Sequence, residues 1–373
     1  MALTIPAVIA ERVASHGSEI VLRKKDRGIW KATTWSQLGD LVRQIGSALI
    51  ATGFRPGDVA CVLAETRPEW VYIDLAVLGI GGISGGIHPE EPADPVGQAL
   101  CHSRCRVLFV ENEEQLDKAL LVRERCPALQ RIVIIDMKGL RDFADPMCSS
   151  LQSFVVADAS VADWDAGVAA ITSEQPALMT PGGKGRTLNH GDVLRLIAEA
   201  RPMLALRTGD ERLALLSMCQ VMERVLGLYL SLDARAISNY LENPDTAIEN
   251  LQEVQPTVLA TDARVWDMLH GRISSAVTGA THVQRALYRW AIAAGARGGP
   301  MALLARACVL HAVKREIGLS RLRVAYTGGS LPPEIQRWTT ALGVNVQRID
   351  GQAARGAALD ASNQALMEEA YGT

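Results

Sequence analysis

The first third of the sequence predicts an amphipathic helix. Apolar residues recur there at the spacing of one helix face, at Leu38, Leu41, Val42, Ile45 and Leu49. Thr34, followed three residues later by Gln37, is typical of a capping box at the start of a helix, and Gly53 marks its end.

Short apolar runs follow this helix and predict buried strands at residues 58–64, 106–110 and 131–135. Helices are expected between them, at 69–78 after Pro68 and at 113–125. Strands that alternate with helices in this way indicate a mostly parallel sheet with helices on both faces.

Residues 137–175 show only weak patterning, and we interpret them as a connection between two lobes. Beyond them the alternation resumes. Strands are predicted at 213–217, 256–260, 321–326 and 344–348, and helices at 223–232 and 332–342. We therefore expect a first α/β lobe over residues 1–175, including the connection, and a second α/β lobe over residues 176–373.

The composition narrows the class of protein. Of the 373 residues, 48% are hydrophobic and 21% charged, which is typical of a globular chain. A net charge of −3 with 5% aromatic residues gives no indication of nucleic-acid binding. The N-terminus has no basic segment of a signal peptide, and no apolar run is long enough for a transmembrane helix. We expect a cytoplasmic protein.

The seven cysteines are scattered and odd in number, which favours reduced thiols over a disulfide framework. Cys101-His102-x-x-Cys105 is the one cluster that suggests a metal site. It lacks a second ligand pair at zinc-finger spacing, so buried or surface thiols are the better interpretation. We expect no metal site.

Several segments, in order along the chain, resemble motifs of one family. They are Arg67-Pro68-Glu69-Trp70 (N-R-P-E-W), 103–117, Val221-Met222-Glu223-Arg224-Val225 (V-F-E-R-V), Pro256-Thr257 with Arg264-Val265-Trp266 (P-T-x-x-x-x-V-P-R-V-W), and Thr327-Gly328-Gly329-Ser330 (S-G-G-A). The sequence is similar to the adenylate-forming (AMP-binding) superfamily, specifically the long-chain acyl-CoA synthetases.

This resemblance implies an α/β fold, the large N-terminal domain of the acyl-CoA synthetase fold. That domain has two stacked α/β lobes with a cleft between them. The sequence ends soon after the family's Y-G-x-T-E motif, whereas the family continues with a ribose-binding aspartate, a hinge and a mobile C-terminal lid that carries the catalytic lysine. The β-rich subdomain and the lid are therefore expected to be missing from this sequence.

The departures from the family motifs fall where its chemistry lies. The family's phosphate loop, Y-T-S-G-T-T-G-x-P-K-G, corresponds here to the seven residues Met179–Gly185. Lys184 and Gly185 align with the K-G of that loop, and His190 aligns with a histidine downstream. The shorter turn cannot wrap a triphosphate in the same way, and Pro181 removes one backbone N–H donor. Lys184 and Gly185 are thus a vestigial phosphate loop.

Two further motifs have lost their chemical groups. Gln220 stands where the family has the histidine of L-P-L-S-H-V-F-E-R, and a carboxamide cannot become a cation. Residues 350–354 align with Y-G-x-T-E but read D-G-Q-A-A, so the carboxylate that would bind Mg²⁺ is replaced by Ala354. Asp350 is a new ionisable group at that position. These losses predict that ATP-dependent adenylation has been abandoned.

The same residues also have plainer interpretations. Residues 182–186 suit a mobile surface loop better than a working phosphate site, and 79–82 follow a helix, unlike a dinucleotide fingerprint. His190 suits a partly exposed structural histidine. Glu223 and Arg224 suggest an intrahelical or lobe-bridging ion pair. We expect Trp266 to be a core residue rather than part of a ligand-binding wall. We expect Cys219 to pack inertly rather than to act as a nucleophile.

Candidate residues follow from the resemblance. Candidate catalytic residues are Gln220, Asp350 and Cys219, and candidate substrate-binding residues are Gln220, Glu223, Arg264, Trp266, Gly328 and Gly329. We expect a non-adenylating relative that retains an acyl cleft and binds an acyl chain, an acyl-CoA or an acyl carrier protein. No cofactor is expected, and neither ATP nor Mg²⁺ is expected to be retained.

Two alternatives stay open. One is a weak AMP-forming long-chain fatty-acid ligase, completed by a lid from another polypeptide. The other is a non-catalytic structural or regulatory partner of a full-length homologue, as a homo-oligomer or a hetero-complex.

Overall fold

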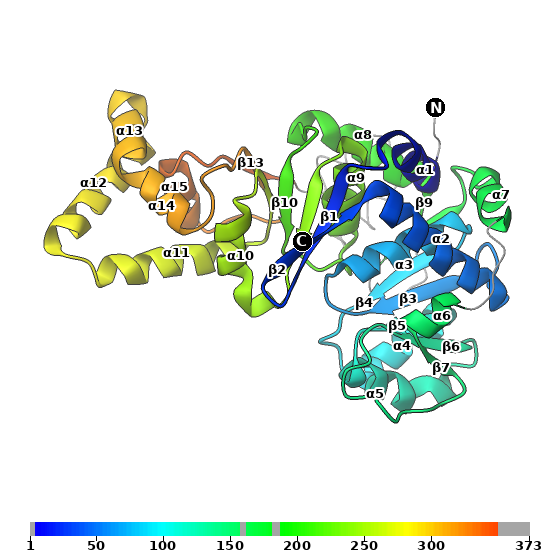
Figure 1. Ribbon diagram of the computed structural model, residues 1–373. Coiled ribbons are helices and arrows are strands. Elements are labelled where there is room, and N and C mark those ends of the chain that lie inside the picture. Colours follow the sequence, from blue (N-terminus) through cyan, green and yellow to red (C-terminus); the bar gives the residue numbers. More distant parts are fainter. Residues whose placement is uncertain (1–3, 157–161, 181–186, 350–373) are drawn as a thin grey trace. The chain divides into compact units, whose positions relative to one another are not determined.

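The computed structural model describes residues 4–156, 162–180 and 187–349 (Figure 1). The chain divides into two compact units, each built from three segments. Unit 1 comprises residues 1–23, 31–203 and 217–233, and unit 2 comprises 24–30, 204–216 and 234–373. We expected one boundary between the lobes, after residue 175. The chain instead passes between the two units several times, because residues 24–30 and 204–216 contribute to the sheet of unit 2.

Unit 1 contains a seven-stranded sheet in the order β7-β6-β5-β3-β4-β8-β9. Its strands are β3 (Val59–Leu63), β4 (Ile83–Ile87), β5 (Cys105–Val110), β6 (Arg131–Ile134), β7 (Cys148–Ser150), β8 (Pro176–Met179) and β9 (Thr187–Asn189). All neighbours pair in parallel except β8 and β9, which are antiparallel. The predicted strands at 58–64, 106–110 and 131–135 are confirmed as β3, β5 and β6.

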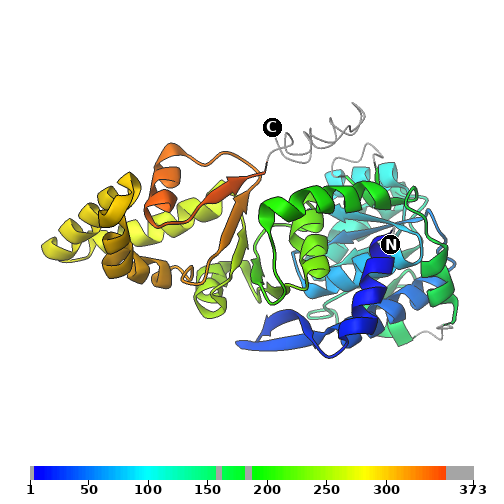
Figure 2. The same cartoon turned by 90° about the horizontal axis from the view of Figure 1, so that it is seen from above.

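Helices cover this sheet (Figures 1 and 2). They are α1 (Ile5–His16), α2 (Trp35–Ala51), α3 (Pro68–Gly79), α4 (Ala93–Ser103), α5 (Glu113–Val122) followed by a 3₁₀ turn (Arg123–Arg125), α6 (Leu151–Val156), α7 (Ala162–Ala170), α8 (His190–Leu204) and α9 (Leu230–Ala234). The capping box predicted at Thr34 is confirmed: its hydroxyl accepts from the Gln37 N–H, and the Gln37 side chain accepts from the Thr34 N–H. Pro68 opens α3, as expected.

The interpretation of residues 137–175 as a connection between lobes is wrong. This stretch lies within unit 1, where it supplies the edge strand β7 and the helices α6 and α7. Phe154 of α6 makes an edge-to-face contact with Phe109 of β5, with ring centroids 6.0 Å apart. Trp164 of α7 packs over two glycines, Gly46 of α2 and Gly79 of α3. Elements this short carry too few apolar residues to show a periodicity.

Unit 2 contains the strands of a second sheet, whose order is β14-β13-β12-β10-β11-β1-β2. Its strands are β1 (Ile20–Asp26), β2 (Ile29–Thr34), β10 (Glu211–Ala214), β11 (Ile237–Tyr240), β12 (Val258–Ala260), β13 (Val324–Thr327) and β14 (Val346–Arg348). Neighbouring strands from β11 to β14 pair in parallel. Of the residues that form β1 and β2, only 24–30, around the turn that joins the two strands, belong to unit 2. The other residues of these strands belong to unit 1.

The helices of unit 2 are α10 (Ala247–Val254), α11 (Ala263–Thr278), α12 (His282–Arg297), α13 (Gly299–Ala305) with a π-helical segment (Arg306–Leu310), α14 (His311–Glu316) and α15 (Pro333–Ala341), with a 3₁₀ turn at Pro244–Thr246. A core cluster that includes Leu213, Leu259 and Trp338 joins them to the strands. The expected mostly parallel α/β architecture is confirmed. Within the described residues no helix combines the length and apolarity needed to span a bilayer.

Candidate functional site

The carboxyl ends of parallel strands form the edge where open α/β sheets bind ligands. In unit 1, β3, β4, β5 and β8 run in parallel, so the residues that follow them gather at one edge of the sheet. Glu65 and Arg67 follow β3, Glu111 follows β5, and Thr180 follows β8. The backbone N–H of Glu65 donates to Glu111 (2.7 Å), which ties two of these connections together.

A turn at residues 217–220 packs against this edge. The Met218 N–H donates to the Thr66 hydroxyl (2.9 Å), and the Gln220 N–H donates to the Ser217 carbonyl (3.0 Å). Gly86 of β4 permits the approach, because a Cβ there would lie 3.0 Å from the Cα of Cys219. A side chain at Gly86 would therefore push the turn away from the sheet.

Gln220 lies at the end of this turn with a partly exposed side chain. Its backbone carbonyl accepts from the Arg224 N–H (3.2 Å), which begins the helical segment that follows. Its carboxamide can donate and accept hydrogen bonds, but it carries no charge at any ordinary pH. The side chain can thus orient a polar ligand without neutralising an anionic one.

Cys219, one residue earlier, is buried. Burial raises the pKa of its thiol to about 12. At neutral pH the side chain is consequently a thiol and not the thiolate that acts as a nucleophile.

A buried ion pair supports the segment after the turn. Arg224 donates to one carboxylate oxygen of Asp74 on α3, and the Tyr229 hydroxyl donates to the other. Ser84 of β4 donates to the same carboxylate (2.5 Å), and its backbone carbonyl accepts from Arg224 (3.2 Å). The Arg224 and Asp74 side chains are both fully buried. The sequence suggested an intrahelical or lobe-bridging ion pair at Glu223 and Arg224, and the structure shows that Arg224 pairs with Asp74 of α3.

Residues Glu223–Tyr229 form a π-helix, where the sequence predicted a regular helix over 223–232. Gly227 has no side chain, so the buried carboxylate of Glu223 can lie against its backbone. A Cβ at Gly227 would come within 2.4 Å of both carboxylate oxygens. π-Helical turns interrupt the regular side-chain spacing and are frequent at functional sites. Here the wide turn places Arg224 and Tyr229 against the same carboxylate of Asp74.

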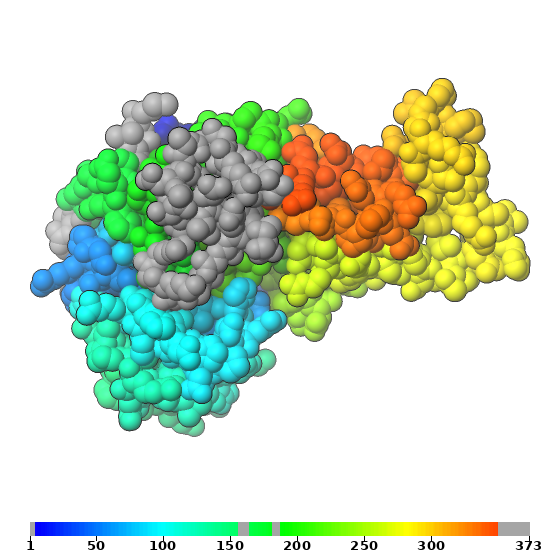
Figure 3. Space-filling model, turned by 180° about the vertical axis from the view of Figure 1, so that it is seen from behind, coloured from blue at the N-terminus to red at the C-terminus, as the bar shows by residue number. Residues whose placement is uncertain are grey.

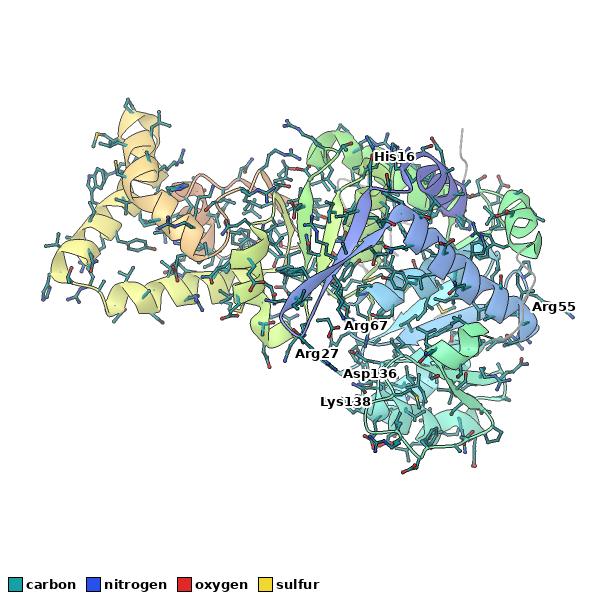
Figure 4. All side chains as sticks on the ribbon, viewed as in Figure 1. His16, Arg27, Arg55, Arg67, Asp136 and Lys138 are labelled. Atoms are coloured by element: carbon teal, nitrogen blue, oxygen red, sulfur yellow. The ribbon has the colours of Figure 1, made fainter. Side chains whose placement is uncertain are left out.

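The edge of the sheet is predominantly acidic. The pKa of Glu65 is raised by partial burial and then by the charges of Glu111 and Glu90. Arg67, labelled in Figure 4, donates to Glu69 (2.8 Å) and to Glu111 (3.0 Å). The guanidinium of Arg67 is thus neutralised by two carboxylates, which leaves little positive potential for a polyphosphate at this part of the edge.

His190, the first residue of α8, was expected to be partly exposed. That expectation is wrong, because the side chain is completely buried. Neither ring nitrogen has a hydrogen-bond partner within the described part of the chain. Burial lowers the pKa of the imidazole to about 4, so His190 is neutral at physiological pH.

In unit 2, a cavity of about 240 Å³ lies beside β13, β14 and α15. Its lining is mostly polar and comprises Thr327, Gly329, Ser330, Leu331, Gln336, Thr339, Thr340, Val344, Asn345, Val346 and Arg348. Gly329 follows the carboxyl end of β13, with its N–H directed to the Thr327 hydroxyl (3.5 Å). Of the two candidate glycines, Gly329 lines this cavity and Gly328 immediately precedes it.

Two other candidates lie on α11 of unit 2. The side chain of Arg264 is 90% exposed and pairs with Asp262 at 3.2 Å. Trp266 is fully buried and packs in the core with Leu269 and Ile273. Neither side chain lines the cavity beside β13.

The remaining candidates, Lys184, Gly185 and Asp350, lie outside the described residues. The two cysteines of Cys101-His102-x-x-Cys105 make different contacts. Cys101 is exposed, and its Sγ contacts the Sγ of Cys126. Cys105 is buried, and its thiol donates to the Val107 carbonyl.

Sequence reasoning missed Asp74 and Ser84. A signal was available, because Asp74 is a charged residue inside an otherwise apolar part of α3. Charged side chains that are fully buried are almost always paired. The partner could not be identified from the sequence, since Arg224 lies 150 residues away.

Comparison with known proteins identifies the family. Residues 9–351 match the family described as AMP-binding enzyme. The chain belongs to this family. A long-chain-fatty-acid–CoA ligase FadD15 of Mycobacterium bovis is 26% identical over 347 residues, which are 87% of this chain and 54% of that protein. ACSBG2 of Rattus norvegicus, also named a long-chain-fatty-acid–CoA ligase, is 22% identical and covers 94% of this chain and 56% of its own length.

This AMP-binding family member spans about half the length of the curated relatives it matches. Solved structures share its fold. An A-PCP didomain of a carboxylic acid reductase from Segniliparus rugosus, in complex with AMP, has a TM-score of 0.72 at 14% identity and covers 94% of this chain and 52% of its own. The anthranilate CoA ligase AuaEII, in complex with anthranoyl-AMP, has a TM-score of 0.67 at 19% identity, with 94% and 59% covered. The expected adenylate-forming fold is confirmed.

Proposed function

We propose that this AMP-binding family member is an acyl-CoA ligase-like protein that binds acyl groups or acyl thioesters and does not itself adenylate a carboxylic acid. The observation that carries the proposal is Gln220. The acyl-CoA synthetase motif that this segment resembles has a histidine at this position. In this chain an uncharged carboxamide stands there, at the end of the turn 217–220.

A cation at this position matters because adenylation joins two anions, a carboxylate and a triphosphate. Positioned cations and N–H donors supply most of the acceleration in phosphoryl and adenylyl transfer. A carboxamide retains hydrogen bonding but loses the charge. The shortened sequence at Met179–Gly185 points the same way, because fewer backbone N–H groups are available to a triphosphate.

The electrostatics of the strand edge support the same proposal. Glu65, Glu90 and Glu111 raise the negative potential there, and Arg67 is engaged by two carboxylates. The acyl chain and the thioester group of an acyl-CoA are uncharged and compatible with this environment, whereas the triphosphate of ATP is not. The proposal therefore includes no bound ATP, Mg²⁺ or other cofactor.

The names of the relatives suggest the ligand class, long-chain fatty acids and their CoA thioesters. The test is calorimetric titration of the 373-residue chain with palmitoyl-CoA, with palmitate and with ATP–Mg²⁺, together with exchange of pyrophosphate into ATP in the presence of palmitate. We expect binding of palmitoyl-CoA or palmitate, no ATP binding and no exchange above the protein-free rate.

Two variants sharpen the test. Gln220→His restores the imidazole and Gln220→Asn keeps a carboxamide, so any exchange gained only by Gln220→His would identify the missing cation. Pyrophosphate exchange by the unmodified chain, abolished by Lys184→Ala, would overturn the proposal in favour of a weak AMP-forming ligase. Failure to bind any acyl ligand, with co-purification of a full-length homologue, would instead favour a structural or regulatory partner.

A further inference from the structure

Exposed apolar side chains are concentrated on the helices α11–α13 of unit 2. Of the eleven large apolar residues that are exposed in the described part of the chain, seven lie between residues 268 and 304. Val283 is 77% exposed and Leu303 is 67% exposed. Single exposed apolar residues are ordinary, but a concentration of them marks an interaction surface.

The exposed residues of α12 form a stripe. Val283, Leu287 and Trp290 stand at positions i, i+4 and i+7, which share one face of a helix. Another side of α12 is occupied, because a Cβ at Gly295 would lie 2.6 Å from the Ala341 carbonyl of α15. Ala291 and Ala294, which continue the same side toward the end of α12, are buried, so the exposed stripe belongs to the part of the helix before them.

Helix α13 adds Met301, Leu303 and Leu304, all about half-exposed or more. Figures 1 and 2 show α12 and α13 side by side at the end of unit 2 that is remote from its sheet, and Figure 3 shows this segment as a yellow projection. We call the six residues Val283, Leu287, Trp290, Met301, Leu303 and Leu304 the α12–α13 apolar surface.

The segment around this surface is strongly basic. Residues 268–315 contain seven lysines and arginines and no aspartate or glutamate, in a chain whose net charge is −3. Arg289 and Arg297 of α12 are exposed, and neither forms an ion pair within the described residues. Arg272, another of these seven residues, forms weak ion pairs with Glu249 and Glu316, each at 3.9 Å.

Two partly buried cations of the segment increase the positive potential. Arg306 donates to the carbonyls of Gly295, Thr340 and Ala341, which are neutral acceptors. The pKa of Lys314 is lowered by burial and then by the charge of Arg306. Two cations thus lie close enough to repel each other, and the segment presents uncompensated positive charge beside an apolar face.

We propose that the α12–α13 apolar surface docks on a membrane surface that contains anionic phospholipids. A tryptophan and aliphatic side chains on one helix face, next to arginines, are the combination that inserts at the boundary between headgroups and acyl chains. The arginines are complementary to anionic headgroups. A nucleic acid would match the charge but would leave the aliphatic residues without a favourable environment.

The test is flotation of the 373-residue chain with vesicles of phosphatidylcholine alone and of phosphatidylcholine with one quarter phosphatidylglycerol. We expect binding to the anionic vesicles, at least tenfold weaker binding to the neutral ones, and a loss of binding as NaCl is raised from 50 to 500 mM, conditions that shorten the Debye length several-fold. Weak binding at 50 mM NaCl to both kinds of vesicle would overturn the proposal.

Variants locate the surface. Arg289→Gln/Arg297→Gln is expected to weaken binding about 10- to 30-fold, since each arginine near an anionic surface contributes on the order of 1 kcal/mol. Leu287→Ser/Leu303→Ser is expected to abolish it. Leu121→Ser, which removes a 75% exposed leucine from α5 of unit 1, is the matched control and should bind as the unmodified chain does. Equal loss in the control, or a dimer in sedimentation velocity that only Leu287→Ser/Leu303→Ser dissociates, would contradict membrane docking.

Discussion

Arg224 and Asp74 form an ion pair in which both side chains are fully buried. The pair joins the π-helix Glu223–Tyr229 to α3, and hydrogen bonds from Tyr229 and Ser84 complete the carboxylate's environment. Burial and the charge of Asp74 raise the pKa of the Tyr229 hydroxyl well above its usual value, so Tyr229 stays a donor. The cluster fixes the segment that follows the turn carrying Gln220.

Replacing Asp74 with alanine should strongly destabilise the protein. The change leaves the Arg224 guanidinium buried without a counter-charge, and breaking a buried pair from one side costs about 3–5 kcal/mol. The measurement is urea-induced unfolding followed by tryptophan fluorescence. Asp40→Ala is the control, because Asp40 is 59% exposed and its pair with Arg43 is worth about 0–1 kcal/mol. Similar losses in the two variants would contradict the buried pair.

The stability of the protein should decrease as the pH falls from 6.5 to 4, in part because of His190. Its folded-state pKa of about 4 lies below the value of 6.5 for an unperturbed histidine. The unfolded chain therefore binds a proton first, and the free energy of unfolding falls by up to about 3 kcal/mol across this interval and levels off below it.

The contribution of His190 can be isolated by comparing variants. His190→Phe keeps an aromatic ring and removes the proton, so the pH dependence between 6.5 and 4 should become shallower. The same replacement at the exposed His311 is the control for the substitution itself. Parallel profiles for the unmodified chain and His190→Phe would show that folding does not lower the pKa of His190.

Two helical glycines should respond to alanine in opposite directions. A Cβ at Gly46 of α2 would lie 2.0 Å from the Trp164 ring, whereas nothing lies within 4 Å of a Cβ at Gly271 of α11. Gly46→Ala should lower the free energy of unfolding by about 1–3 kcal/mol through overpacking. Gly271→Ala should raise it by about 0.5–1 kcal/mol, because alanine favours a helix interior. Thermal unfolding of both variants checks this, and stabilisation by Gly46→Ala would show that Trp164 is not seated there.

Mild oxidation should link Cys101 to Cys126. Their sulfur atoms are 3.0 Å apart, and Cys101 is exposed. Burial raises the pKa of Cys126 to about 12, so reaction should begin at Cys101. With diamide as oxidant, the two thiols lose two hydrogen atoms to form one disulfide, and diamide is reduced to the hydrazine.

Peptide mapping by mass spectrometry would detect this link. We expect one cross-linked peptide pair containing Cys101 and Cys126, reversed by dithiothreitol. The Cys101→Ser variant should lack it, and Cys308→Ser, which removes another exposed cysteine, should retain it. A disulfide between Cys61 and Cys105 in place of this one would contradict the arrangement of α4.

The local pattern of the sequence was sufficient for much of the fold. The capping box at Thr34, the proline that opens α3 and the apolar strands β3, β5 and β6 follow from interactions within a few residues, and the structure confirms each of them. The family motifs likewise identified the adenylate-forming fold. The elements within residues 137–175 were missed because a single aromatic anchor such as Trp164 produces no periodic pattern.

The sequence by itself thus determined the elements whose signals are local, and it determined the chemical identity of Gln220, an amide that no fold can turn into a cation. The tertiary structure alone decided which charges are paired and which side chains are buried. Arg224 binds Asp74, 150 residues away, and His190 is enclosed and neutral. Burial and ion pairing depend on which atoms packing brings together. The distance between two residues along the chain does not reveal whether they make such a contact.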